Sequence, residues 1–128
     1  MNILMDTHTF IWSSISPQKL STTAKKLIID QNHNLFLSFA SIWEMQIKLQ
    51  LGKLRFDVPL SELLTIQQQV NQIQLLSIDL KHIWALERLP PHHRDPFDRM
   101  LIAQAMATKM PILSIDDAFD SYLIERLW

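Results

Sequence analysis

Cysteine is absent from the 128-residue sequence, and glycine occurs once, at Gly52. Without cysteine the chain has neither a disulfide framework nor a thiolate zinc site, and this fits a reducing cytoplasm. With a single glycine it also has no glycine-rich loop that could cradle phosphates. These absences exclude disulfide scaffolds, cysteine-ligated zinc proteins and P-loop proteins, and we expect a cytoplasmic protein.

Long apolar runs and a strong excess of one charge are also missing. No segment approaches the roughly 18 consecutive apolar residues of a membrane-spanning helix. Residues 1–6 contain no basic region of the kind that opens a signal peptide. We therefore expect no membrane association and no secretion. The formal net charge is −1, so any contact with nucleic acid must come from local basic clusters.

The sequence has enough apolar residues, 48%, to form the core of one domain covering residues 1–128. Short apolar runs alternate with segments of helical periodicity. This pattern predicts an α/β fold with a mostly parallel sheet covered on both faces. The expected strands are 2–5, 35–39, 74–78 and 112–115. The expected helices are 21–31, 41–52, 59–71, 80–89 and 96–109, with a last helical turn at 118–123.

Four short acidic signatures lie where these elements begin or end. They are Met5-Asp6-Thr7, Ser41-Ile42-Trp43-Glu44, Asp95-Pro96-Phe97-Asp98 and Ser114-Ile115-Asp116-Asp117. The carboxyl ends of parallel strands share one edge of a sheet, so the four signatures should meet there. A pocket of carboxylates without cysteine suits hard cations, Mg²⁺ or Mn²⁺. Phosphodiester hydrolysis is the reaction class that uses such a site.

Each signature also has a helix-capping explanation. Ser41 and Glu44 match a capping box, and Asp95 matches an N-cap before Pro96. Asp116 could cap the last helix, and Asp6 could be the polar end of a strand. We assign Ser41 and Asp95 to capping. Metal binding and catalysis we assign to the set Asp6, Glu44, Asp98 and Asp116.

The expected helix at 41–52 has two apolar stripes, one formed by residues 42, 45 and 49 and the other by 43, 47 and 51. Two stripes predict packing on the sheet and on a second surface, such as another copy of the chain. Glu44 and Lys48 lie between the stripes. As an alternative to a functional role, they could form an ordinary surface ion pair, four residues apart on the helix. Lys48, Arg94 and Arg99 are candidate substrate-binding cations. The loop His92-His93-Arg94 is a weaker candidate for phosphate binding.

Four longer motifs contain these signatures: Leu4–Trp12, Ser41-Ile42-Trp43-Glu44 through Gly52-Lys53-Leu54, His93–Ala105 and Leu113–Phe119. With these motifs the sequence resembles the PIN-domain ribonucleases, in particular the VapC-like toxins of bacterial type II toxin–antitoxin systems. The resemblance spans essentially the whole chain.

The resemblance implies a three-layer α/β/α sandwich with a central sheet of about four to five strands. It also implies an endoribonuclease that depends on Mg²⁺ or Mn²⁺, forms a homodimer and is inhibited by an antitoxin. Asp6, Glu44, Asp98 and Asp116 correspond by position to the acidic quartet of the family, with Asp117 as a further candidate. Ser114 stands where many members have threonine, and it keeps the hydroxyl group.

Two other functions stay open at this stage. A phosphohydrolase of the haloacid-dehalogenase type also begins with an aspartate at a strand end, but it needs a second aspartate two residues later, where this chain has His8. The second alternative is a PIN fold without catalysis that binds an antitoxin or RNA. A complete acidic quartet favours the enzyme.

Overall fold

Five parallel strands form one sheet in the part of the chain that the computed structural model describes, residues 1–92 and 94–128. Their order across the sheet is β3-β2-β1-β4-β5. The strands are β1 (Asn2–Met5), β2 (Asn34–Ser38), β3 (Gln74–Leu76), β4 (Ile112–Leu113) and β5 (Arg126–Leu127). The predicted parallel sheet of four to five strands is therefore confirmed.

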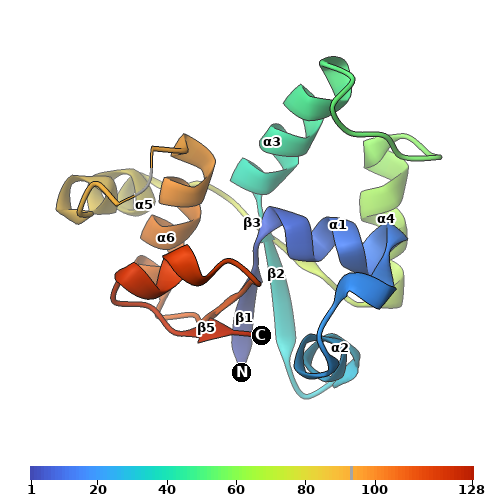
Figure 1. Cartoon of the computed structure of the whole chain (residues 1–128), viewed down its shortest axis with the longest axis horizontal. Coiled ribbons are helices and arrows are strands. Elements are labelled where there is room, and N and C mark those ends of the chain that lie inside the picture. Colours follow the sequence, from blue (N-terminus) through green and yellow to red (C-terminus); the bar gives the residue numbers. More distant parts are fainter. Residues whose placement is uncertain (93) are drawn as a thin grey trace.

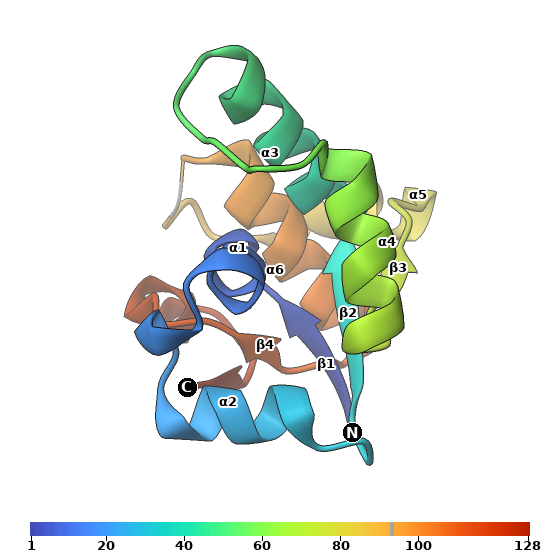
Figure 2. The same cartoon turned by 90° about the vertical axis from the view of Figure 1, so that its right-hand side faces the viewer.

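Helices cover both faces of the sheet, as Figure 1 shows, with α1, α2 and α4 on one side of the central strands and α5 and α6 on the other. Figure 2, turned by 90°, shows α1, α2 and α4 in front of the sheet. The helices are α1 (Thr7–Ile15), α2 (Thr22–Ile29), α3 (Phe39–Gln50), α4 (Leu60–Val70), α5 (Leu80–Ala85) and α6 (Pro96–Thr108). The described residues also form 3₁₀ turns at η1 (Pro17–Lys19), η2 (Leu86–Arg88) and η3 (Asp117–Ser121).

The alternation of side chains along β1 explains the two cores. Ile3 and Met5 point into the core that contains Phe10 of α1 and residues of α2 and α4, whereas Leu4 points into the core beneath α6. Alanine at Ala103 and Ala105 lets α6 pack closely there, and both residues are buried. The central strands β1 and β4 are buried, as expected for parallel strands covered on both faces, whereas the edge strand β3 is largely exposed.

The carboxyl ends of β1 and β2 are the upper ends of these strands in Figure 1, where α1 and α3 begin. Helix α6 also begins near this edge and packs against α3. Two of the four acidic signatures thus follow strands of one sheet, and the other two lie on helices beside it.

Several elements of the described chain differ from the sequence-based expectation. β3 and β4 are shorter than predicted, and α5 ends at Ala85 rather than at Leu89. Helix α1 was not predicted, and neither was strand β5, which is two residues long. Helix α3 begins at Phe39, with Ser38 as its N-cap, so the assignment of Ser41 to the cap is wrong. The Ser38 side chain accepts a hydrogen bond from the N–H of Ala40 at 3.0 Å, and the helix therefore starts directly at the end of β2.

None of the helices in residues 1–92 and 94–128 combines the length and apolar character needed to cross a lipid bilayer.

Candidate active site

Asp6 follows β1 directly and is the N-cap of α1. Its two oxygens are held by different donors: the N–H of Thr9 donates to Oδ1 at 2.8 Å, and the hydroxyl of Ser114 donates to Oδ2 at 2.5 Å. The side chain is 4% exposed. Burial raises the pKa of Asp6 above its usual value, and these hydrogen bonds oppose the rise. Strand geometry and capping together fix this carboxyl group.

The register of the sheet explains why Ser114 meets Asp6. Met5 pairs with Leu113, so the next residue of each strand lies in the same row. The N–H of Asp6 donates to the carbonyl of Leu113 at 3.2 Å, and the Thr9 hydroxyl donates to the same carbonyl at 2.8 Å. Two segments more than a hundred residues apart in the sequence are thereby joined at the edge of the sheet.

Glu44 lies in the second turn of α3, is 5% exposed and uses both of its carboxylate oxygens. Oε1 accepts a hydrogen bond from the Thr7 hydroxyl at 2.8 Å, and Oε2 lies 2.8 Å from Nζ of Lys48. The hydroxyl of Thr7 is also 2.9 Å from that of Ser41. Ser41 is therefore part of a buried hydroxyl network, which explains its position inside the helix better than capping does.

Asp98 lies in the first turn of α6 and is half-buried. Its pKa is raised to about 7, chiefly by burial, and further by the negative charges of Asp95, Glu44, Asp6 and Asp116. These four carboxylates therefore lie close enough to Asp98 for their charges to raise its pKa. The expected convergence of the acidic signatures at one edge of the sheet is therefore present.

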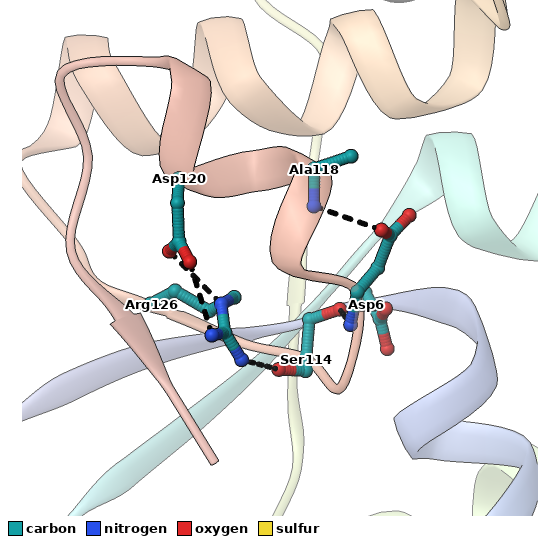
Figure 3. Close-up of polar contacts among 6 residues, drawn as sticks. Asp6, Ser114, Ala118, Asp120 and Arg126 are labelled. Carbon is teal, nitrogen blue, oxygen red and sulfur yellow. Dashed lines mark hydrogen bonds and ion pairs between the residues drawn. The ribbon is translucent and has the colours of Figure 1, made fainter.

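Asp116 is exposed and caps η3 by accepting a hydrogen bond from the N–H of Ala118 at 3.0 Å. Figure 3 shows how this segment is held: Ser114 lies between Asp6 and Arg126. The guanidinium of Arg126 donates to the carbonyl of Ser114 at 3.2 Å and contacts both oxygens of Asp120. Arg126 therefore ties β5 to the chain that carries Asp116.

The two neighbouring acidic residues differ in their surroundings. Asp95 caps α6, accepting from the N–H of Phe97 at 2.8 Å, so its assignment to capping is confirmed. Asp117, the further candidate, is exposed in the first turn of η3.

The three candidate substrate-binding cations differ in their contacts. Lys48 is paired with Glu44. Arg99 donates to the carbonyl of Pro90 at 3.1 Å and so supports the loop before α6. Arg94 is exposed. The ring of His92 packs edge-on against Tyr122, with centroids 5.3 Å apart. His93, which belongs to the predicted phosphate-binding loop and to the third motif, lies outside the described residues.

The oxygen-only donor set of this site fits a hard divalent cation. Among residues 1–92 and 94–128, however, no group of three or more His, Cys, Asp or Glu side chains is arranged to hold a metal ion. The oxygens of Glu44 contact Lys48 and Thr7, and those of Asp6 contact Thr9 and Ser114.

The sequence-based assignment missed two hydroxyl residues that shape the site, Thr7 and Thr9. Both follow Asp6 within the first turn of α1 and are buried. Their positions were visible in the sequence Asp6-Thr7-His8-Thr9, because an aspartate before hydroxyl residues is typical of a helix start. That signal would also have predicted α1.

The fold and this site define a class: a parallel α/β domain whose acidic side chains gather at the carboxyl edge of the sheet. The family can be stated as well. The PIN domain family model matches residues 3–123, and the chain belongs to the PIN-domain family. The resemblance seen in the motifs is thereby confirmed. Comparison with curated proteins gave no match.

Three solved structures share the fold over nearly their full length. VapBC2 from Rickettsia felis, bound to a DNA fragment from its promoter, has a TM-score of 0.75 at 11% identity, covering 99% of this chain and 98% of that one. FitAcB from Neisseria gonorrhoeae has a TM-score of 0.67 at 14% identity, covering 98% and 96%. A toxin–antitoxin complex from Klebsiella pneumoniae has a TM-score of 0.63 at 11% identity, covering 98% and 96%.

Proposed function

We propose that this protein is a metal-dependent endoribonuclease that hydrolyses phosphodiester bonds of RNA. The observation that carries the proposal is the position of acidic side chains from separate segments at the carboxyl edge of one sheet, with Asp6 and Glu44 buried there. The raised pKa of Asp98, about 7, agrees with it, since the charges of neighbouring carboxylates contribute to the rise. Repulsion among neighbouring carboxylates destabilises the fold, so a site that keeps them together is better explained by a cation than by capping alone. Membership of the PIN-domain family supports hydrolysis as the reaction class.

Asp6, Glu44, Asp98 and Asp116 would hold Mg²⁺ or Mn²⁺, with Asp117 at the rim. A bound cation would supply the activation of water and the neutralisation of charge on the phosphate. The hydroxyls of Thr7 and Ser114 orient Glu44 and Asp6 through hydrogen bonds. Arg94, Arg99 and Lys48 would contact the RNA backbone, where a cation positions a strand without reading its sequence.

The biological role that we propose is that of a VapC-like toxin, with a cognate antitoxin and a homodimeric assembly. One of the structural relatives is a toxin–antitoxin complex, and another is VapBC2 bound to a DNA fragment from its promoter. Exposed apolar side chains of the kind that interfaces cover support a protein partner: Trp43 is 60% exposed and Leu51 is 63% exposed. We propose a cytoplasmic location on the absence of cysteine.

RNA cleavage tests the enzyme directly. With Mn²⁺ the wild type should linearise and then fragment a circular RNA, which has no ends for an exonuclease. Asp6→Asn should lower the rate by at least about a hundredfold, the scale on which removal of a group that stabilises transition-state charge acts. Asp57→Asn is the matched control, because Asp57 is an exposed carboxylate on the loop between α3 and α4, and it should cleave like the wild type.

Equal cleavage by the wild type and Asp6→Asn would refute the enzyme and point to a contaminating nuclease. An inactive wild type that binds RNA or an antitoxin would favour the non-catalytic PIN module. Millimolar Mn²⁺ should also raise the melting temperature of the wild type by mass action, by an amount set by RT ln(1 + [Mn²⁺]/Kd). Membership of the PIN-domain family argues against the alternative of a haloacid-dehalogenase-type phosphohydrolase.

A further inference from the structure

We call Asp6, Glu44, Asp98 and Asp116 the acidic centre. Lys48 forms an ion pair with one of these residues, Glu44. Its Nζ lies 2.8 Å from Oε2 of Glu44, and within residues 1–92 and 94–128 no ion pair involves Asp6, Asp98 or Asp116. Glu44 is almost fully buried, and a buried carboxylate without a compensating charge would be strongly unfavourable. Lys48 therefore balances the charge of the buried Glu44 carboxylate.

The two partners of Glu44 are held very differently. Thr7 is buried and holds Oε1 through a neutral hydroxyl. The Lys48 side chain is 36% exposed, and within the described residues Glu44 is its polar partner. A lysine ammonium on a flexible aliphatic stem can move into water without breaking any other polar contact. Oε2 can thus be released while Oε1 stays fixed.

We propose that Lys48 is a displaceable counterion of Glu44, which keeps the buried carboxylate neutralised until a divalent cation takes over Oε2. This inference rests on the proposed metal-dependent function. Oε2 of Glu44 would then be paired with a positive charge both before and after the exchange. It also sets the affinity of the site, because the incoming ion must compete with an ammonium group covalently attached to the same helix.

Asp6 provides the internal contrast. Both of its oxygens accept hydrogen bonds from uncharged donors, Thr9 and Ser114. Such donors can share a carboxylate with a cation, since each oxygen has further lone pairs. At Glu44, by contrast, the partner is the ammonium group of Lys48, which would repel an incoming cation. The competition is therefore specific to Glu44 and Lys48.

Titration of Mn²⁺ into the purified protein by calorimetry, at fixed pH and ionic strength, tests the proposal without RNA. Lys48→Met should bind Mn²⁺ about tenfold more tightly than the wild type, because it removes both a competitor and a repelling charge. Lys48→Arg should bind no more tightly than the wild type. Lys26→Met removes the same charge from an exposed position on α2 and should not change the affinity.

The outcomes separate the two proposals. An unchanged or weaker affinity of Lys48→Met, with Mn²⁺ still binding to the wild type, overturns the counterion while leaving the metal-dependent function standing. Absence of Mn²⁺ binding in the wild type and all variants instead overturns the metal-dependent function itself. If Lys48→Met does not fold, Lys48→Gln replaces the ammonium with a neutral amide donor. It should likewise bind Mn²⁺ more tightly than the wild type, and equal or weaker binding overturns the counterion.

Discussion

Asp98 is a half-buried carboxyl group whose pKa is about 7, compared with 3.8 in an unfolded chain. The native state therefore binds the proton more tightly than the unfolded state. The stabilising contribution is complete below about pH 4 and is lost as the pH rises through 7. Above pH 7 the ionised group is held beside other carboxylates, which opposes folding.

Asp98→Asn should remove this penalty and the enzymatic activity together. In the absence of divalent ions at pH 8, we expect the variant to be as stable as the wild type or more stable. The gain should be on the order of 1–2 kcal/mol, after a discount for solvent screening at a half-exposed group. Chemical denaturation at pH 4 and pH 8 measures it, and the gain should vanish at pH 4. A marked loss of stability at pH 8 would mean that Asp98 mainly supports the start of α6.

His82 predicts the opposite dependence on pH. The ring is fully buried, its Nδ1 accepts the N–H of Asp79 at 2.9 Å, and burial lowers its pKa from 6.5. The native state thus favours the neutral ring, and stability should be complete above pH 6.5 and fall as the pH drops below that value. His82→Gln should flatten this acid limb in thermal unfolding scans between pH 5 and 7.5. An unchanged acid limb would assign the loss of stability to other groups.

At the scale of single elements, the start of α3 can be tested with two serines of the same segment. Ser38→Ala removes the N-cap and should lower the free energy of unfolding by about 1 kcal/mol. Ser41→Ala should have a smaller effect, because Thr7 keeps its hydrogen bond to Glu44. Urea denaturation measures both. A larger loss from Ser41→Ala would indicate that the helix depends on the hydroxyl network more than on its cap.

The helix caps show what local sequence signals could and could not predict. Asp95 caps α6 as predicted, and Asp116, which we assign to metal binding, also caps η3. The assignment of Ser41 fails because Ser38 lies about one helical turn earlier, and the apolar run 35–39 predicts a strand that continues through Phe39. Local propensity cannot decide between two serines that both fit a cap. The direct passage from β2 into α3 decides it in the folded protein.

The missed elements have a common physical cause. Helix α1 contains threonine, isoleucine and aromatic residues with modest intrinsic helix propensity, so composition alone did not reveal it. Strand β5 pairs with β4 through two residues, which is too short for a period-two pattern. Both elements depend on packing against the sheet rather than on their own sequence.

At the scale of the whole molecule, the second apolar stripe of α3 predicts self-association. Trp43 remains exposed although its ring meets Phe97 edge-on at 5.3 Å. We expect a dimer by light scattering at micromolar concentration, and Trp43→Glu should shift it toward monomer. Ile29→Glu is the control, because Ile29 is 75% exposed on α2 and lies on neither stripe. A monomeric wild type would contradict the prediction that the second apolar stripe of α3 is a dimer interface.

The acidic centre itself was predictable in position but not in detail. Topology alone brings Asp6 and the segment after β4 to the same edge, which the sequence pattern was sufficient to predict. The pairing of Glu44 with Lys48 was also foreseeable from their spacing of four residues. The contact between Thr7 and Glu44 was not, because it depends on how α1 and α3 leave neighbouring strands.

The strand order β3-β2-β1-β4-β5 has a consequence for the timing of folding. β1 pairs with β2 through four residues close in sequence, but with β4 through only two residues more than a hundred positions away. Contacts of such long sequence separation form late and slowly. The half of the sheet containing β1, β2 and β3 can therefore assemble first, and local opening can detach β4 together with β5. A partly folded chain, or a folded chain with this local opening, would bring Asp6 and Glu44 together without Asp116. It would be largely folded and would still lack the complete proposed site.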